Sequence, residues 1–261
     1  MKLHRLLVVL LFFVLLNTGC GESKDVRIKR RINSLSAKAR NASHDTRDHN
    51  MQLLAAEGEY AVPYLLDGLE NKDEFIRKYC AMALAKIGSE DAIEPIRNML
   101  FQDTSDENRA AAAGCLATLK KEAAIPDLIK ALKQDTSVNA HQVIRAVLTR
   151  KGIASVAREQ LLPYLKGPDI NMRIEARETI VNMGADSVPA LTGLLSTTDD
   201  QTLILEVFKA LVKIGDTSVL HVMKNTMQRF PAWDDNEERK KKNKFYKELE
   251  GLYNNLYLLQ K

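Results

Sequence analysis

Histidine and cysteine are the residues of this sequence that could bind a metal ion or act as nucleophiles, and their spacing supports neither role. The five histidines are scattered, and His44 and His49 lie five apart, which does not suit one face of a helix. There is no Cys-x-x-Cys pair, no His-Glu-x-x-His motif and no acidic calcium loop. No serine, histidine and acid can be singled out as a triad. We therefore expect no catalytic residue, no metal, no cofactor and no enzymatic activity.

The N-terminal segment before Cys20 has the features of a secretory signal. A basic start with Lys2 and Arg5 precedes an unbroken apolar run of eleven residues, 6–16. A helix needs ~20 apolar residues to span a bilayer, so this run is too short for a stable transmembrane anchor. A basic start, an apolar core and small residues at the exit are typical of a signal peptide, here residues 1–19.

The residues Thr18-Gly19-Cys20 resemble the lipobox of bacterial lipoproteins, in which the cysteine is lipidated and becomes the mature N-terminus. The third residue before the cysteine is usually Leu or a similar aliphatic, and here it is Asn17. The resemblance implies a lipid on Cys20, a short tether over residues 20–23 and a lipid-anchored place in the cell envelope. Since no Asp follows the cysteine, it implies the periplasmic face of the outer membrane if the source is Gram-negative. Ordinary cleavage to a soluble secreted protein is the alternative.

The composition is that of a folded protein and argues against a nucleic-acid partner. Hydrophobic residues make up 45% and charged residues 28%. The formal net charge is +4, and loss of Lys2 and Arg5 would leave 36 basic against 34 acidic residues, which is too small an excess for nucleic-acid binding. Residues 20–46 are the most basic stretch, and they form either a solvated end or a contact with anionic lipid headgroups. The cations concerned are Lys24, Arg27, Lys29, Arg30 and Arg31.

An internal repeat of 31 to 32 residues runs along the chain. Glycines mark it with spacings of 30, 64, 32 and 31, and the member missing from the double spacing falls at Lys120. Each glycine suits the left-handed position that ends a helix. The marks are Gly58, Gly88, Gly152, Gly184 and Gly215. A preferred helix N-cap stands fifteen residues before each mark, which predicts a second helix of about fourteen residues in every repeat. These caps are Ser43, Asp73, Ser105, Ser137, Asp169 and Asp200.

A buried stripe is expected along each of these second helices. Small apolar residues, among them Cys80 and Cys115, stand five or eight places before the mark. Free thiols packed in the core are favoured there, because a disulfide needs α-carbons within ~7 Å and neighbouring helix axes lie ~8–10 Å apart. An aliphatic residue stands four places before every mark: Leu54, Leu84, Leu116, Leu148, Ile180 and Leu211.

A first helix precedes each second helix, and Pro63, Pro126 and Pro189 stand in its first turn, where proline loses no hydrogen bond. No period-two strand pattern is present. The sequence therefore predicts an all-α chain of about seven antiparallel helix hairpins over residues 24–261, with cap hairpins at 24–57 and 217–261. The last helix is apolar enough to lie back on the stack through Leu249, Leu252, Tyr253, Leu256, Tyr257 and Leu259.

The stretch Phe75-Ile76-Arg77-Lys78-Tyr79-Cys80-Ala81-Met82-Ala83-Leu84-Ala85-Lys86-Ile87-Gly88 resembles the short HEAT repeats, in the variety seen in phycobilisome lyase-type proteins. The resemblance covers about residues 43–230 and implies a right-handed α-solenoid, a HEAT-like superhelix. It also implies that a recurring arginine bonds turn groups between neighbouring units, although these arginines could instead be solvated. His141 and Ile204 interrupt the series. Its members are Arg47, Arg77, Arg109 and Arg173.

The outward face of the second helices, which usually lines the concave side of such a stack, is where we expect a partner. Phe75, Tyr79 and Met82 beside a floor of Ala and Gly would form an apolar anchor for a protein or peptide. The alternative is that these side chains pack against neighbouring hairpins. The rest of the expected surface consists of Lys86, Ala111, Val143, Arg150, Glu175 and Glu178.

These features favour a membrane-tethered scaffold or adaptor for protein–protein interaction at the bacterial cell envelope. A carrier that holds a small molecule, lipid or polymer in the groove is one alternative. A lyase-like protein is another, since the lyase-type relatives suggest attachment of a bilin to a cysteine. That work occurs in the cytosol of phototrophs, and the signal segment argues against it.

Overall fold

The computed structural model describes residues 22–39, 43–230 and 237–260, so the expected signal segment and Cys20 lie outside the described part. The chain divides into two compact units, of which the first ends at Ala83 and the second begins at Leu84. The elements of unit 1 are α2 (Lys24–Asn33), α3 (His44–Ala56), η1 (Gly58–Ala61), α4 (Val62–Leu69) and the first part of α5 (Glu74–Ile87).

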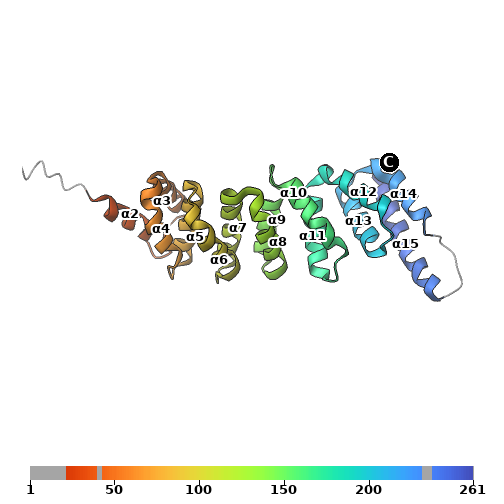
Figure 1. The fold of residues 1–261 in the computed structure, drawn as a ribbon, viewed down its shortest axis with the longest axis horizontal. Helices are drawn as coiled ribbons and strands as arrows, with labels where there is room; N and C mark the ends of the chain where they lie inside the picture. The colour runs from red at the N-terminus through yellow and green to blue at the C-terminus, as the bar shows by residue number, and fades with distance from the viewer. Residues whose placement is uncertain (1–21, 40–42, 231–236, 261) are drawn as a thin grey trace, which may run out of the picture. The chain divides into compact units, whose positions relative to one another are not determined.

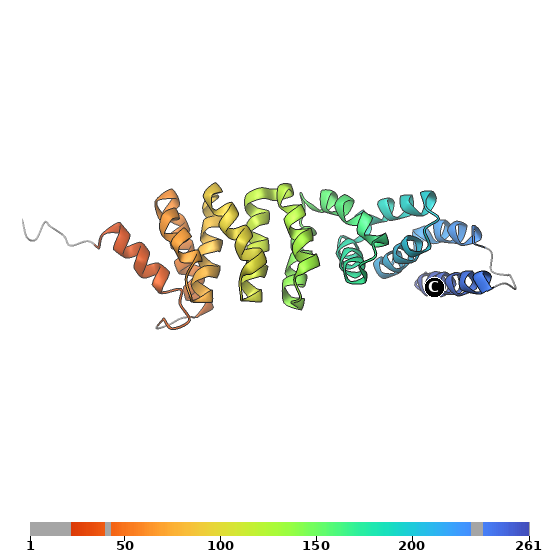
Figure 2. The same ribbon diagram turned by 60° about the horizontal axis from the view of Figure 1, so that its bottom comes forward.

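Unit 2 continues with alternating first and second helices. Its long elements are α6 (Ile93–Gln102), α7 (Asp106–Lys120), α8 (Ile125–Gln134), α9 (Val138–Leu148), α10 (Ala154–Leu161), α11 (Ile170–Asn182), α12 (Val188–Thr197), α13 (Gln201–Ile214), α14 (Leu220–Gln228) and α15 (Glu237–Leu258). Short 3-10 segments join them: η2 (Glu90–Ala92), η3 (Lys121–Ala124), η4 (Leu162–Lys166), η5 (Gly184–Ser187) and η6 (Thr217–Val219). Figures 1 and 2 show α6 to α9 side by side as antiparallel pairs. The described residues form no strand, and the all-α expectation is confirmed.

The second helices begin where the sequence places their caps. The side chains of Ser43, Ser137, Asp169 and Asp200 accept a hydrogen bond from an amide of the first turn, as N-caps do. Asp73 does the same for the amide of Phe75 at 3.0 Å. Ser105 makes no such bond with its side chain. The Asp103 carboxylate instead accepts from the Ser105 amide at 2.9 Å, so an aspartate two residues earlier fixes this helix start.

The repeat marks lie in left-handed backbone, with one shift of a residue. All five marking glycines have positive φ, from 61° at Gly58 to 99° at Gly152. In the repeat without a glycine the positive φ, 49°, belongs to Lys121 and not to the expected Lys120. The reason is that α7 continues through Lys120, so the chain reverses one residue later.

The aliphatic ladder forms the core of each unit. Leu54 is fully buried in unit 1, as are the five ladder residues of unit 2 from Leu84 to Leu211. The prolines stand at the start of α4, α8 and α12. No described helix has the length and apolar character to cross a bilayer.

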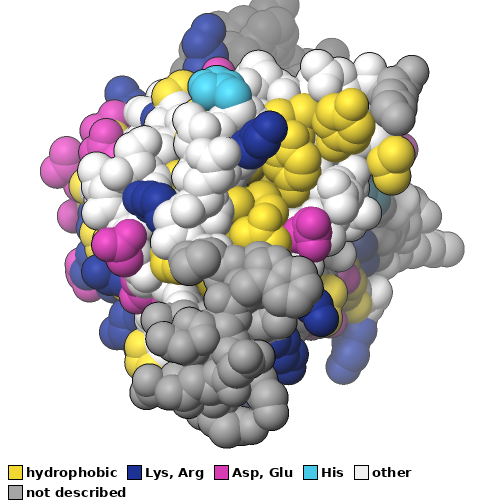
Figure 3. Space-filling model, turned by 90° about the vertical axis from the view of Figure 1, so that its right-hand side faces the viewer, with side chains coloured by type: hydrophobic (Ala, Val, Ile, Leu, Met, Phe, Trp, Pro, Cys, Tyr) yellow, Lys and Arg dark blue, Asp and Glu magenta, His cyan; other side chains and the backbone are white. Residues whose placement is uncertain are grey.

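The last helix, α15, lies back on unit 2 through only part of its apolar set. It contacts α13 and α14, and Leu249 and Leu256 are fully buried. Tyr257 is exposed, because successive residues of a helix turn by about 100° and it falls off the packing side. Leu259 is exposed as well, and it lies after the end of α15. Figure 3 shows hydrophobic side chains gathered on the face formed by these last helices.

Candidate functional site

The recurring arginines close the turn inside their own hairpin. Arg77, Arg109 and Arg173 each donate to a backbone carbonyl six residues earlier, at 2.9, 2.9 and 2.6 Å. That carbonyl lies in the turn between the first and second helix of the same pair, whereas the resemblance implied a bond between neighbouring units. Arg47 differs, because its Nε donates to the Leu35 carbonyl at 2.9 Å and its guanidinium covers the Phe75 ring at 4.2 Å.

His141 continues this row where the sequence predicted a gap. Its Nε2 lies 2.9 Å from the carbonyl of Asp135, which is again six residues earlier. Its Nδ1 lies 3.0 Å from Glu175 on α11, and Arg145 donates to the same carboxylate at 2.8 Å. Both ring nitrogens of His141 are therefore within hydrogen-bond distance of an oxygen, one in its own turn and one on α11. Ile204 does interrupt the row, because it is a buried apolar side chain.

Arg109 also links two hairpins of unit 2. Its Nε and Nη2 donate to the two oxygens of Asp135 at 2.6 and 3.0 Å, in the bidentate geometry that makes such pairs strong. Burial alone would raise the pKa of Asp135, but the hydrogen bonds from Arg109 and the Ser137 amide outweigh it and lower that pKa. This is the contact between neighbouring units that the resemblance implied for the whole series.

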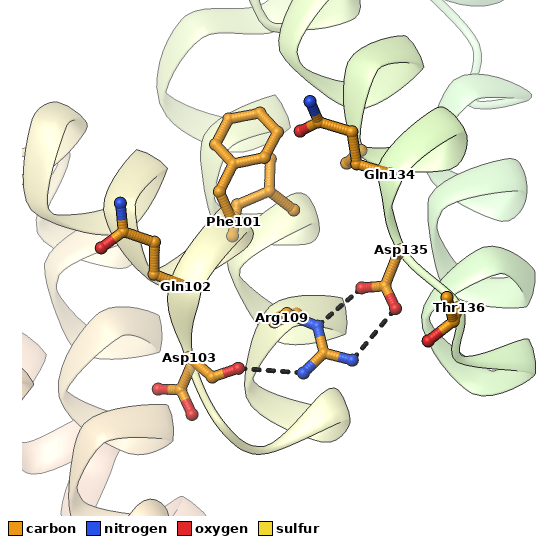
Figure 4. Close-up of a pocket in the computed structure, with 9 residues that line it drawn as sticks. Phe101, Gln102, Asp103, Arg109, Gln134, Asp135 and Thr136 are labelled. Carbon is orange, nitrogen blue, oxygen red and sulfur yellow. Dashed lines mark hydrogen bonds and ion pairs between the residues drawn. The ribbon is translucent and has the colours of Figure 1, made fainter.

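A polar pocket of about 290 Å³ lies beside this pair, between the ends of α6 and α8. Figure 4 shows the Arg109 guanidinium at its centre, Phe101 above it, and Gln102 and Gln134 on either side. Sequence reasoning missed this pocket, although Asp103-Thr104-Ser105 and Asp135-Thr136-Ser137 repeat the same tripeptide 32 residues apart. The full lining is Leu100, Phe101, Gln102, Asp103, Arg109, Ala131, Gln134, Asp135 and Thr136.

The prediction that Tyr79 lies at the centre of an exposed aromatic anchor in unit 1 is wrong. Tyr79 is only 2% exposed, and its ring meets the edge of His44 with 6.4 Å between ring centroids. Phe75 is half-buried beneath the guanidinium of Arg47, and Met82 is also half-buried. Tyr79 therefore packs within the hairpins, as the alternative held, and offers no surface to a partner.

The small-residue floor in unit 2 lies on the accessible side of α7 and α9. Ala111, Gly114 and Val143 are half-buried, and Ala146 is exposed. Arg150 lies across this floor, with Nη2 3.7 Å from the point that a Cβ on Gly114 would occupy. Arg150 is an exposed residue and has no ion pair with any described residue.

The acidic part of the expected surface is already neutralised. Glu175 is held by His141 and Arg145, and Glu178 pairs with Lys213 and Arg177. Both carboxylates are thus bound to neighbouring helices of unit 2. In unit 2 the exposed residues Lys86 and Arg150 are the members of the expected surface that carry an unpaired charge within the described chain.

The two cysteines of the described part are free and buried, as their core positions indicated. Burial raises the pKa of both Cys80 and Cys115 to about 12, so neither is a reactive thiolate at neutral pH. The described residues contain no cluster of three or more His, Cys, Asp or Glu that could hold a metal ion.

The comparison with family models identifies helical repeats in part of the chain. A family model of HEAT repeats matches residues 62–148. A search of curated proteins found no match. Among solved structures, the complex of CpcE and CpcF of phycocyanin lyase from Nostoc sp. PCC7120 is similar, with 19% identity and a TM-score of 0.40 over 89% of this chain and 97% of that one.

Two further structures are similar in the same way. The protein YibA of Escherichia coli has 18% identity and a TM-score of 0.43, over 90% of this chain and 96% of that one. Human deoxyhypusine hydroxylase in complex with glycerol has 13% identity and a TM-score of 0.38, over 87% of this chain and 96% of that one.

Proposed function

We propose that this chain is an adaptor without catalytic activity, which binds an acidic segment of a protein partner on the outward face of α7 and α9. The observation that carries the proposal is Arg150, an exposed residue that has no ion pair with any described residue and whose guanidinium lies over the Gly114 floor. We further propose that a lipid on Cys20 holds the chain at the cell envelope, on the strength of the signal-like segment that ends at Thr18-Gly19-Cys20.

The chemistry of this face fits a carboxylate-bearing helix or extended segment. Ala111 presents almost no side chain, so a partner backbone can approach α7 closely beside the Arg150 guanidinium, which lies over Gly114. The planar guanidinium of Arg150 has a fork of N–H donors that matches a carboxylate in two parallel hydrogen bonds. The nearby carboxylates of Glu175 and Glu178 are already paired, so they would not repel an acidic partner strongly.

A site-specific crosslink tests the partner face. A photo-reactive residue in place of Thr118, which is exposed at the end of α7, should crosslink one defined protein in intact cells. Arg150→Glu should lower the yield of that crosslink about tenfold or more, because it places like charges opposite each other. Lys133→Glu makes the same charge change at an exposed site on α8 and should leave the crosslink intact. Equal crosslinking in both variants would refute the proposal.

A carrier function is the second candidate, and the pocket of about 290 Å³ between α6 and α8 is the observation that favours it. Phe101 offers a ring face, while Gln102 and Gln134 offer amide donors and acceptors. A small polar molecule that copurifies with the chain, and is lost in Gln134→Leu, would favour this function over the adaptor.

A further inference from the structure

The N-terminal helix α2 carries more positive charge than the neighbouring carboxylates neutralise. It contains five cations and one acid, Asp25, and buries Ile28 and Ile32 against α3 and α4. The side of the helix that carries Val26 and Arg30 is exposed.

Three of the cations converge on one carboxylate. Lys24 Nζ, Arg27 Nη2 and Arg31 Nη1 lie 3.3, 3.0 and 2.9 Å from Glu57. Burial alone would raise the pKa of Glu57, but the hydrogen bonds from Lys24 and Arg27 outweigh it and lower that pKa, so the group is anionic at neutral pH. One negative charge balances only one of the three positive charges. The Arg27 Nε in addition is buried, and no described residue accepts a hydrogen bond from it.

The other two cations stand on the outside of α2. Lys29 is exposed, and the side chain of Arg30 is 69% exposed and forms one ion pair with a described residue, Glu22, at 2.7 Å. Between them and the start of the helix lies Val26, an aliphatic side chain that is 53% exposed. Charge and apolar surface therefore occur together on this face.

Two tyrosines complete the face from η1 and α4. Lys24 Nζ lies 4.2 Å from the ring centroid of Tyr60, and Lys29 Nζ lies 5.6 Å from that of Tyr64. Tyr60 is 47% exposed, and its hydroxyl donates to Asp25 at 2.5 Å. That hydroxyl, with the one of Tyr64, lowers the pKa of Asp25, so this carboxylate remains bound to the rings.

We propose that the surface of Val26, Lys29, Arg30, Tyr60 and Tyr64 docks on a bilayer rich in anionic phospholipid. Lysine and arginine bind anionic headgroups, tyrosine prefers the level of the headgroups, and an exposed valine enters the apolar boundary below them. An acidic protein would use the cations but would gain less from the exposed valine. This inference rests on the proposed envelope address, and it adds a second attachment beside the lipid.

The distance along the chain supports the combination. Lys24 follows Cys20 by four residue steps, and an extended chain spans at most ~3.6 Å per step, so α2 would begin within about 14 Å of the Cys20 backbone that carries the acyl group. The docking surface could then reach the bilayer that holds the lipid.

Vesicle binding without the lipid tests the docking surface by itself. Every described contact lies within residues 22–260, so a chain that starts at residue 22 keeps all of them. It should float with vesicles of phosphatidylcholine and phosphatidylglycerol, remain unbound with phosphatidylcholine alone, and be released as salt rises. Lys29→Glu combined with Arg30→Glu should weaken binding about tenfold or more.

The matched control reverses two exposed cations of unit 2, Lys133→Glu with Lys224→Glu, and should bind as the parent does. Circular dichroism checks that both double variants are folded. The proposal would be overturned if the chain did not bind anionic vesicles, or if it bound both vesicle types equally. It would also be overturned if both double variants lost vesicle binding to the same extent. The proposed lipid on Cys20 is tested separately, by growth of cells that make the full-length chain with labelled palmitate. If the chain incorporates no label, or if Cys20→Ser keeps the label, the lipid on Cys20 is refuted and the vesicle result is unchanged.

Discussion

Lys121 is the one non-glycine residue of the described chain with a positive φ, and it stands where every other repeat mark is glycine. Its backbone has φ of 49° and ψ of −124°. Glycine adopts this conformation freely, whereas a residue with a side chain adopts it at a cost in free energy. We expect Lys121→Gly to raise the free energy of unfolding by about 1 kcal/mol, measured by urea denaturation.

Lys120→Gly is the matched control for that prediction. Lys120 is the last residue of α7, where glycine has lower helix propensity, so stability should fall by up to ~1 kcal/mol. A Lys121→Gly chain no more stable than the parent would show that the backbone at this position carries no strain.

At the scale of the helix, His141 joins α9 to two other parts of unit 2, the turn at Asp135 and Glu175 on α11. His141→Leu should lower the free energy of unfolding by about 1–3 kcal/mol, because it leaves the half-buried Glu175 and the carbonyl without one hydrogen-bond partner each. His141→Arg should cost less, since arginine makes this turn contact in three other repeats. Thermal unfolding of the two variants measures the difference, and equal losses would show that the donors at residue 141 do not matter.

Across the whole molecule, features that recur with the 31-residue period were predictable from the sequence. Contacts that depend on one particular neighbouring side chain were not. The ladder from Leu54 to Leu211 was predictable, because one face of each helix must be buried in every repeat. Tyr79 was not, since its position in the repeat holds Ala111 and Val143 elsewhere, and only the large ring fills the space toward His44. The turn contact of His141 was not predicted, because the repeat motif has arginine at this position. The turn needs only a side chain that can form a hydrogen bond with the carbonyl six residues earlier.

The same reasoning explains why the candidate sites were only partly predictable. Arg150 stands two residues after the end of α9 and is exposed, as the repeat pattern predicted. The pairing of Glu175 and Glu178 with α9 and α13 depends on which long side chains reach across unit 2, and no spacing along the chain encodes that reach. The pocket beside Phe101 likewise depends on how far apart two turns lie.

Both units contain a partly buried aspartate whose negative charge favours the folded state. Burial would raise the pKa of Asp73, but the Ser36 hydroxyl and the Ala37 amide outweigh it, as Arg109 does for Asp135, so both pKa values lie below the ordinary 3.8. A pKa lower in the folded than in the unfolded chain gives stability that is fully present above pH 3.8 to 4 and is lost as pH falls through the folded pKa. The chain should therefore lose stability steeply on acidification below about pH 4.

Asp135→Asn isolates the contribution of unit 2 to this acid sensitivity. The amide cannot ionise, so the variant should be less stable than the parent at pH 7, and the difference should shrink as pH falls toward 3. Denaturant midpoints between pH 3 and pH 7 measure both curves. Asp127→Asn removes another aspartate of unit 2, and because Asp127 pairs with Arg97 on a more accessible surface, it should change the curve less. A constant difference between parent and Asp135→Asn at every pH would mean that the Arg109 pair stabilises the fold through shape rather than charge.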